Sequence, residues 1–298
     1  MENEDLYIIG NGFDIYHGLE SRYSNFKEYL RVCDPVLHDN VVKFLPVKEN
    51  WCDLELAFAY LDIDQVIDEA SEFLHSYSAE NWSDSFHHDY QFELDRIVTA
   101  LSRGLKSHFY QWIRQLNLSL TNQHPNKIVR IPPSSTFLNF NYTRTLQCVY
   151  GVKDTHIMHI HGEADQDESS IILGHSWNPK DIPDLNDVPN PEDMDTRVME
   201  GNERINSYFG DTFKPSSEII ESRYDFFSGL KKIRNVYVLG HSLSEVDLPY
   251  FEEIIEHIDI DSNWYVTYYG EEEFIRHGET LSGLGVGNFE LCSFTDLE

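Results

Sequence analysis

Two histidines one residue apart, His159 and His161, are the side chains of this sequence best suited to proton transfer. An imidazole titrates near neutral pH, so it can act as a general acid or base. Residues two apart in a strand share a face of the sheet, and we expect both rings on one side. The pair could also ligate a metal, but neither an HExxH motif nor a cysteine pair supports this, so no metal is expected. The pattern favours a catalytic role over a place in the core.

Two glycine turns follow apolar runs and offer places for a phosphate. The first contains Gly10, Asn11, Gly12, Phe13 and Asp14, and the second contains Gly240, His241 and Ser242. Glycine lets backbone N–H groups approach a phosphate without a Cβ in the way, and a following helix adds a favourable dipole. The first turn matches GxG but not GxGxxG, so an ordinary strand-to-helix turn is the alternative. The second is not a GxSxG elbow, because residue 244 is serine, which disfavours a serine hydrolase.

Polar side chains beside these turns complete the candidate site. Asp14 disfavours a phosphate close by and could instead bind a ribose hydroxyl, an arginine or a metal. Asn141 follows another apolar run, and its amide could bind a ribose, an amide group or a water. The alternative for Asn141 is that it caps a helix beginning near Thr143. Asp247 follows the second glycine turn and precedes an amphipathic segment.

Short apolar runs rich in β-branched or aromatic residues predict the strands that position these side chains. They cover residues 6–9, 136–140, 156–160, 170–173, 236–239, 264–269 and 289–294. Several are apolar without alternation, which indicates strands covered on both faces, as in a parallel sheet. Loops at the carboxyl ends of parallel strands converge on one crevice. We therefore predict an α/β, Rossmann-like, mostly parallel sheet with helices on both faces.

A long helical segment separates the first two predicted strands. About 125 residues lie between them, far more than a simple crossover needs. Apolar residues spaced by three and four predict helices over about 53–77 and 86–120, paired over the sheet. We expect one domain over residues 1–298 with a helical insertion at about 50–125. A polar, proline-containing stretch at 178–195 predicts a mobile acidic loop or lid.

Composition narrows the class of protein and its partners. The 298 residues are 41% hydrophobic, enough to build a sizeable core, and carry a formal net charge of -30. Nucleic acid is therefore disfavoured as a partner, because its binders neutralise phosphates with Lys and Arg. No apolar run approaches the roughly 20 residues of a membrane span, and the first residues do not resemble a secretion signal. Four separated cysteines indicate reduced thiols, so we expect a cytoplasmic protein without membrane contact.

Several stretches of the chain resemble the AbiH family of phage abortive-infection proteins. They are IIGNGFDIYHGLESRYSNF at 8–26, WCDLE at 51–55, FLNFNYTRTLQCVYG at 137–151, HIHG at 159–162, LGHS at 173–176 and VLGHSLSEVDLPYF at 238–251. These motifs extend along the chain in the order of the family. The resemblance implies a role in anti-phage defence and a phage component as its trigger.

More remotely, the order of motifs is similar to the sirtuin-like NAD-binding fold. The turn from Gly10 to Gly12 matches its first glycine element, and Asn141 with Tyr142 matches its Asn-Tyr-Asp element, except that Thr143 replaces the acid. The likeness also places His161 at the catalytic His-Gly element, and Gly240 and Ser242 at a late Gly-x-Ser element. The chain lacks the four-cysteine zinc module of sirtuin deacetylases. The resemblance therefore implies NAD cleavage rather than deacetylation.

The leading hypothesis is a hydrolase that cleaves NAD at the nicotinamide glycosidic bond. His161 would be the base, and Asn141 would position water or ribose. The first glycine turn and Ser242 would hold the phosphates, while Asp14, Asp247 or Glu55 would stabilise developing positive charge.

Two alternatives stay open at the level of sequence. One is a metal-dependent nuclease or phosphodiesterase, with a divalent-metal site drawn from a set of acidic and imidazole side chains. That set is Asp14, Asp53, Glu55, His159, His161, His241 and Asp247. The other is a non-enzymatic sensor or toxin partner that is controlled by a bound nucleotide. A homo-oligomer is compatible with all three hypotheses.

Overall fold

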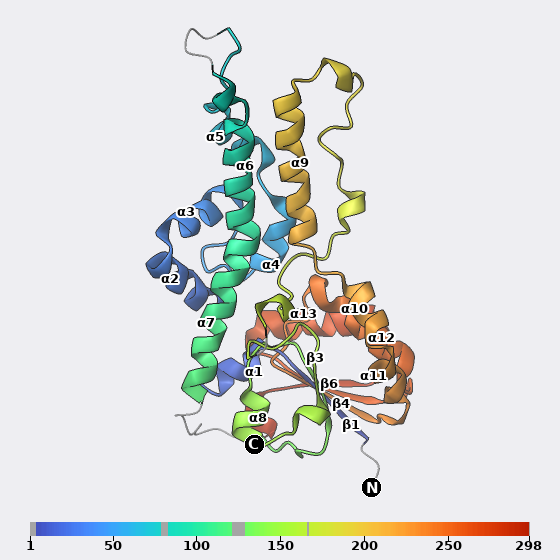
Figure 1. Cartoon of the computed structure of the whole chain (residues 1–298). Coiled ribbons are helices and arrows are strands. Elements are labelled where there is room, and N and C mark those ends of the chain that lie inside the picture. Colours follow the sequence, from blue (N-terminus) through green and yellow to red (C-terminus); the bar gives the residue numbers. More distant parts are fainter. Residues whose placement is uncertain (1–3, 79–82, 121–128, 166, 298) are drawn as a thin grey trace. The chain divides into compact units, whose positions relative to one another are not determined.

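A computed structural model of the chain describes residues 4–78, 83–120, 129–165 and 167–297 (Figure 1). Within this part of the chain, six strands form one sheet, and each strand is parallel to its neighbours. They are β1 (Asp5–Ile9), β2 (Thr136–Asn139), β3 (Ile157–His159), β4 (Asn235–Leu239), β5 (Asn263–Thr267) and β6 (Phe289–Cys292). Each coincides with a predicted strand to within a few residues.

The strand order is β3-β2-β1-β4-β5-β6, which is the order of a doubly wound Rossmann sheet. From β1 the chain moves outward to β3, then crosses to the other side of β1 and moves outward again through β4 to β6. Neighbouring strands β1 and β4 pair in register, with Ile9 opposite Leu239. The predicted Rossmann-like α/β class is confirmed, and the point where the winding direction changes lies between β1 and β4.

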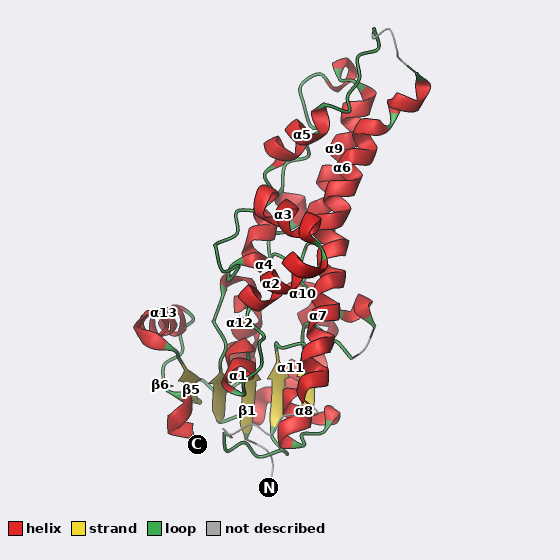
Figure 2. Ribbon diagram, turned by 90° about the vertical axis from the view of Figure 1, so that its left-hand side faces the viewer, coloured by secondary structure: helices red, strands yellow, loops and turns green. Residues whose placement is uncertain are grey.

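Alternating side chains of the strands build an apolar core on each face of the sheet. On one face Leu6, Ile8 and Val236 pack with side chains from α10 (Ser216–Ser222), α11 (Tyr224–Ser228), α12 (Leu248–His257) and α13 (Gly270–Gly283). On the other face Tyr7 and Ile9 pack with α1 (Asn11–Tyr16) and α8 (Thr145–Tyr150). Figure 2 shows the strands side by side with these helices around them. The sheet is thus covered on both faces, as its apolar runs predict.

The chain divides into two compact units. Unit 1 comprises Met1–Arg22, Tyr110–Ile172 and Pro215–Glu298, and it contains the sheet. Unit 2 comprises Tyr23–Phe109 and Leu173–Lys214. Unit 2 therefore begins earlier than the helical insertion expected at about 50–125 and also includes the acidic stretch at 178–195. The expected end of the insertion, near residue 125, lies outside the described residues.

Unit 2 is built from helices, and two of its predicted helices differ from the structure in detail. Its α-helices are α2 (Tyr23–Cys33), α3 (Pro35–Phe44), α4 (Leu54–Ala57), α5 (Ile63–Ser71), α6 (Asp89–Thr99) and α9 (Thr196–Asp211). The helix predicted over 86–120 is realised as α6, a π-helical turn (Ala100–Gly104) and α7 (Leu105–Leu120). The helix predicted over 53–77 is broken, because the backbone of Leu61 is not helical and the Asp62 carboxylate caps α5 by accepting from Gln65 N–H at 3.0 Å.

The strand predicted at residues 170–173 is wrong. This segment follows a short 3-10 turn (Glu168–Ser170) and joins no ladder of the sheet. Its apolar residues Ile171 and Leu173 are buried nonetheless, which explains the misleading pattern. Isolated hydrogen bonds, rather than a ladder, hold the segment in place. Ile172 N–H donates to His161 O at 2.9 Å, and the Tyr142 hydroxyl donates to Ile172 O at 2.6 Å.

The acidic stretch contains only the 3-10 turns η6 (Pro179–Asp181) and η7 (Pro191–Asp193). Its mobility stays a prediction. Among the residues that the structure describes, none of the helices combines the length and the apolar character needed to cross a bilayer.

The pairing of α6 with α9 depends on a glycine. A Cβ at Gly201 would lie 2.6 Å from both Leu94 Cδ1 and Tyr90 Cε1 on α6, closer than any carbon contact allows. We expect Gly201→Ala to lower the free energy of unfolding by about 1–3 kcal/mol through overpacking, measured by urea denaturation. Gly210→Ala on the same helix is the control, because a Cβ there meets nothing within 4 Å. It should stabilise the protein by up to about 1 kcal/mol. Equal effects of the two substitutions would contradict this account of the helix pair.

Candidate active site

The loops after β1 and β4 are joined through their backbones at the carboxyl edge of the sheet. Gly12 N–H donates to Gly240 O at 2.7 Å, and Gly10 N–H donates to Leu239 O at 3.0 Å. No side chain could stand between these loops: a Cβ on Gly240 would lie 2.2 Å from Phe13 N, and one on Gly10 would lie 2.5 Å from His241 Cα. Gly240 also has φ +66°, a conformation that glycine adopts without strain. The two predicted glycine turns therefore meet, as the parallel sheet requires.

This contact changes the interpretation of the first turn. Its Gly12 N–H is occupied by Gly240 O, and Phe13 N–H donates to Gly10 O at 3.0 Å. The Asn11 amide donates to Ser21 O at 2.8 Å, and the Phe13 ring is fully buried in the core beneath the sheet. These N–H groups hold the loops together, which weighs against a phosphate at this turn.

Asn141 and Tyr142 belong to the same junction. The Asn141 amide donates to Gly10 O at 3.0 Å, and Asn141 N–H donates to Asn139 Oδ1 at 3.0 Å. Asn141 therefore ties the loop after β2 to the loop after β1. Tyr142 is buried and its hydroxyl binds Ile172 O, so it anchors the segment that passes beside His161. Both residues lie at the carboxyl edge of the sheet, as predicted, and a structural role explains their hydrogen bonds.

Asp14 lies in a polar pocket that the sequence did not reveal. Its carboxylate is 1% exposed and accepts from the Thr143 and Thr145 hydroxyls, each at 2.5 Å. Burial raises the pKa of Asp14 from 3.8 to about 6, while the hydroxyl bonds act in the opposite direction. Thr143 replaces the acid of the sirtuin-like motif, and here its hydroxyl donates to the carboxylate of Asp14 on α1. A Thr-x-Thr pair after a strand is too common a pattern to have predicted this.

The central feature of the edge is a carboxylate between two imidazoles. His161 Nε2 lies 3.7 Å from Asp247 Oδ1, and His241 Nε2 lies 3.4 Å from Asp247 Oδ2. Leu243 N–H donates to His241 Nδ1 at 3.0 Å, so the neutral His241 ring carries its proton on Nε2, toward the carboxylate. All three side chains are buried. The structure therefore brings His161 next to His241 and Asp247, which lie about 80 residues later in the sequence and were predicted to belong to the same site.

Aromatic rings form the walls of this cluster. Phe140 packs edge-to-face against both imidazoles, with ring centroids 5.2 Å from His161 and 4.4 Å from His241. Tyr250 packs against His161 at 5.5 Å. Asp247 is the N-terminal cap residue of α12, where the helix dipole favours a negative charge. Because the surrounding rings are apolar, a carboxylate here strongly stabilises positive charge on an adjacent imidazole.

His159 does not join His161. Strand β3 ends at His159 and the chain turns, so the two rings reach different faces of the sheet. His159 Nδ1 lies 3.1 Å from Asn141 O, its Nε2 lies 3.1 Å from the Gln147 amide nitrogen on α8, and Glu163 is 4.0 Å away. Burial lowers the pKa of His159, and Glu163 opposes that shift. The expectation that both imidazoles lie on one side is wrong, because the strand is too short for its alternation to reach His161.

Sequence reasoning also missed the basic residues near the edge. Arg144 pairs with Glu163 and lies 3.3 Å from Asp154 Oδ1, so its charge is already neutralised. Arg276 on α13 reaches the second glycine turn, with Nη2 3.4 Å from Ser242 O and 3.7 Å from Glu273 Oε1. Ser242 itself is exposed. A Gly–His–Ser turn with an arginine beside it could contact an anion, but Arg276 is too distant in sequence to have been assigned to the turn.

Fold and site together define a Rossmann-type α/β protein with a buried histidine–aspartate cluster at the carboxyl edge of its sheet. Comparison with protein families matches residues 6–268 to the family described as bacteriophage abortive infection AbiH. The chain belongs to the AbiH family, which supports a role in bacterial abortive infection. Neither the curated proteins nor the solved structures include a match to this chain. The likeness to sirtuin-like proteins therefore stays a prediction.

The glycine contact between the loops can be tested with a matched pair of substitutions. Gly240 and Gly151 both have φ +66°, but a Cβ at Gly151 meets nothing within 4 Å. We expect Gly151→Ala to cost about 1–2 kcal/mol, the cost of the left-handed conformation alone. Gly240→Ala should cost at least about 2 kcal/mol more, because it must also separate the two loops. Urea denaturation of both variants measures the difference, and similar losses would show that the loops have room between them.

Asp14 should make the stability of the protein depend on pH. Because its folded pKa is about 6 and its unfolded pKa is 3.8, the folded chain holds the proton more tightly. The stabilisation is complete below pH 3.8 and is lost as the pH rises through 6. From pH 5 to pH 7.5 the wild type should lose on the order of 1 kcal/mol relative to Asp14→Asn, in which this titration is absent. If the free energies of unfolding of the two proteins change equally with pH across this range, the pKa of Asp14 is not raised.

Proposed function

We propose that this protein acts in abortive infection by binding NAD at the carboxyl edge of the sheet in unit 1 and hydrolysing its nicotinamide glycosidic bond. The observation that carries the proposal is the His161–Asp247–His241 cluster, which stands beside the switch point between β1 and β4. In doubly wound sheets, ligands bind outside the carboxyl ends of the strands at such a point. The AbiH assignment supplies the biological setting, and a reaction in the cytoplasm fits it.

The reaction needs a base and a stabiliser of positive charge. Water attacks C1′ of the nicotinamide ribose, and the electrons of the glycosidic bond return to the pyridinium ring, which leaves as neutral nicotinamide. The proton lost by the water passes to the His161 imidazole and then to solvent. Asp247, 3.7 Å from His161 Nε2, stabilises the imidazolium and the positive charge that develops on the ribose. The products are ADP-ribose, nicotinamide and a proton.

The phosphates of the substrate need a different place from the one predicted. The N–H groups of Gly12 and Phe13 are engaged within the protein. Ser242 is exposed, and the Arg276 guanidinium donates to the Ser242 backbone oxygen at 3.4 Å. An arginine and a serine of this turn could bind a pyrophosphate through charge-assisted hydrogen bonds. We therefore assign the phosphates to Ser242 and Arg276 in this proposal.

The geometry favours proton transfer over the metal-dependent nuclease. The acids and imidazoles that such a site would need have other partners. Asp14 binds two threonines, and His159 contacts Gln147 on α8. Asp53 accepts from Lys48 N–H at 2.9 Å, and Glu55 pairs with the fully buried Lys214 at 2.7 Å. These bonds give both acids structural partners.

The decisive experiment is to incubate the purified full chain with NAD, with and without phage extract, and to measure nicotinamide release. His161→Gln should reduce the rate at least about 100-fold, and Asp247→Asn should reduce kcat with little change in KM. His156→Ala serves as the control, since His156 lies in the 3-10 turn before β3 and contacts Pro133 O. It should react like the wild type.

Two results would overturn the proposal in different ways. If the wild type neither binds NAD nor releases nicotinamide, the substrate is wrong. If His161→Gln retains full defence against phage in cells, the histidine is not catalytic, and a nucleotide-controlled sensor or toxin partner becomes the better explanation.

A further inference from the structure

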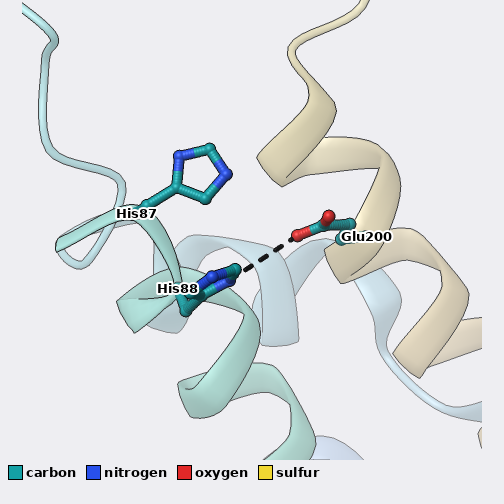
Figure 3. A group of neighbouring side chains, drawn as sticks. All are labelled: His87, His88 and Glu200. Atoms are coloured by element: carbon teal, nitrogen blue, oxygen red, sulfur yellow. Dashed lines mark ion pairs between the residues drawn. The ribbon is translucent and has the colours of Figure 1, made fainter. Parts of the chain in front are cut away.

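A second cluster of side chains with metal-binding chemistry lies within unit 2. Within the residues that the structure describes, His87, His88 and Glu200 place one ligand atom each within 4.8 Å of one another. His87 ends the 3-10 turn η2 (Asp84–His87), His88 caps α6, and Glu200 lies on α9. Figure 3 shows the three side chains around one gap between these elements, with an ion pair from His88 Nδ1 to Glu200 Oε2 at 3.8 Å.

The residue types favour a particular class of ion. Two imidazoles and one carboxylate are the ligand set of zinc sites that keep a position open for water. Ligand bonds of about 2.1 Å place tetrahedral ligand atoms about 3.4 Å apart, so a metal would draw these side chains together by about 1.4 Å at most. Calcium and magnesium prefer oxygen ligands throughout and fit this cluster poorly. His88 is exposed, so an ion has a path from solvent.

The carboxylate of the cluster is held by a neighbouring amide. In the orientation that satisfies both of its partners, the Gln91 amide donates to Glu200 Oε2 at 3.2 Å and accepts from Arg204 Nη2 at 3.0 Å. Gln91 lies on α6 and Arg204 on α9, so this chain of bonds also links the two helices. Partners of this kind orient a metal ligand and reduce the cost of ordering it.

The cluster stands beside a close contact between α6 and α9 at a glycine. Gly201, next to Glu200, leaves no space for a Cβ against Tyr90 and Leu94 of α6. The backbone that carries Glu200 is therefore fixed against the helix that His88 begins. An ion bound by both helices would add to this junction, because binding to the folded state alone stabilises it. The net charge of -30 also raises the local concentration of cations.

We infer that His87, His88 and Glu200 form a binding site for a zinc-class transition-metal ion that ties the start of α6 to α9. The site shares no residue with the histidine–aspartate cluster of unit 1. The proposed hydrolysis of NAD does not require the metal ion that unit 2 would bind here.

The test is calorimetric titration of the full chain with ZnCl₂, followed by Co²⁺ titration with visible absorption to report the coordination geometry. We expect one equivalent of Zn²⁺ to bind and to raise the melting temperature. His88→Ala and Glu200→Gln should each weaken binding at least about tenfold and abolish the thermal shift. Both side chains are accessible to solvent, so the variants should fold, which circular dichroism verifies.

A matched control distinguishes the site from general affinity for cations. His257 and Glu253 on α12 form a closer pair, with Nδ1 3.3 Å from Oε1. His257→Ala should leave the Zn²⁺ affinity unchanged. The inference is overturned if the wild type binds no Zn²⁺, or if His88→Ala and Glu200→Gln bind it as tightly as His257→Ala does.

Discussion

At the middle of the sheet, the loops after β1 and β4 touch through backbone atoms alone. Gly12 N–H reaches Gly240 O at 2.7 Å, and a side chain on Gly10, Gly12 or Gly240 would collide with the opposite loop. The contact arises because β1 and β4 are neighbours at which the winding reverses. The arrangement of the neighbouring side chains depends on this closeness. His241 follows Gly240 directly, and its position next to Asp247 is set by the turn that Gly240 permits.

The same junction explains why several polar residues have structural partners. Asn141 binds Gly10 O, and Asp14 binds the two threonines that follow Asn141. These bonds satisfy groups that the close loops remove from water, since a buried polar atom without a partner is costly. The His161–Asp247–His241 cluster is the group of polar side chains whose contacts are not explained by this junction alone. Its carboxylate has an imidazole on each side and aromatic walls, which is an environment suited to holding a proton on a ring.

Unit 2 follows a different physical logic. Asp62 caps α5, and α6 and α9 are joined by the Gly201 contact and by polar bonds through Gln91. His87, His88 and Glu200 come together there because α9, which lies about 100 residues later in the chain, packs against the start of α6. The two units thus present two groups of polar side chains: a histidine–aspartate cluster on a parallel sheet, and a nitrogen–oxygen ligand set between helices.

Local patterns in the sequence determined much of this protein. Short apolar runs predict the six strands, and several of them lack alternation because a strand covered on both faces carries mostly apolar side chains. Glycines after the runs at 6–9 and 236–239 predict the two turns, and the long gap after the first strand predicts a helical insertion. The motifs of the AbiH family could also be recognised in the sequence, and the family comparison confirms the family over residues 6–268.

Tertiary structure decided what each polar residue does. Alternation predicts His159 and His161 on one face, but β3 ends after three residues and the turn sends His161 toward Asp247. The sequence pattern at 170–173 predicts a strand, because buried apolar residues give the same pattern whether or not the segment pairs with another strand. Thr143, Arg276 and Glu200 could not be assigned to their sites, because their partners are distant in sequence. Period and composition are local properties, whereas a site is made by contacts that only the folded chain creates.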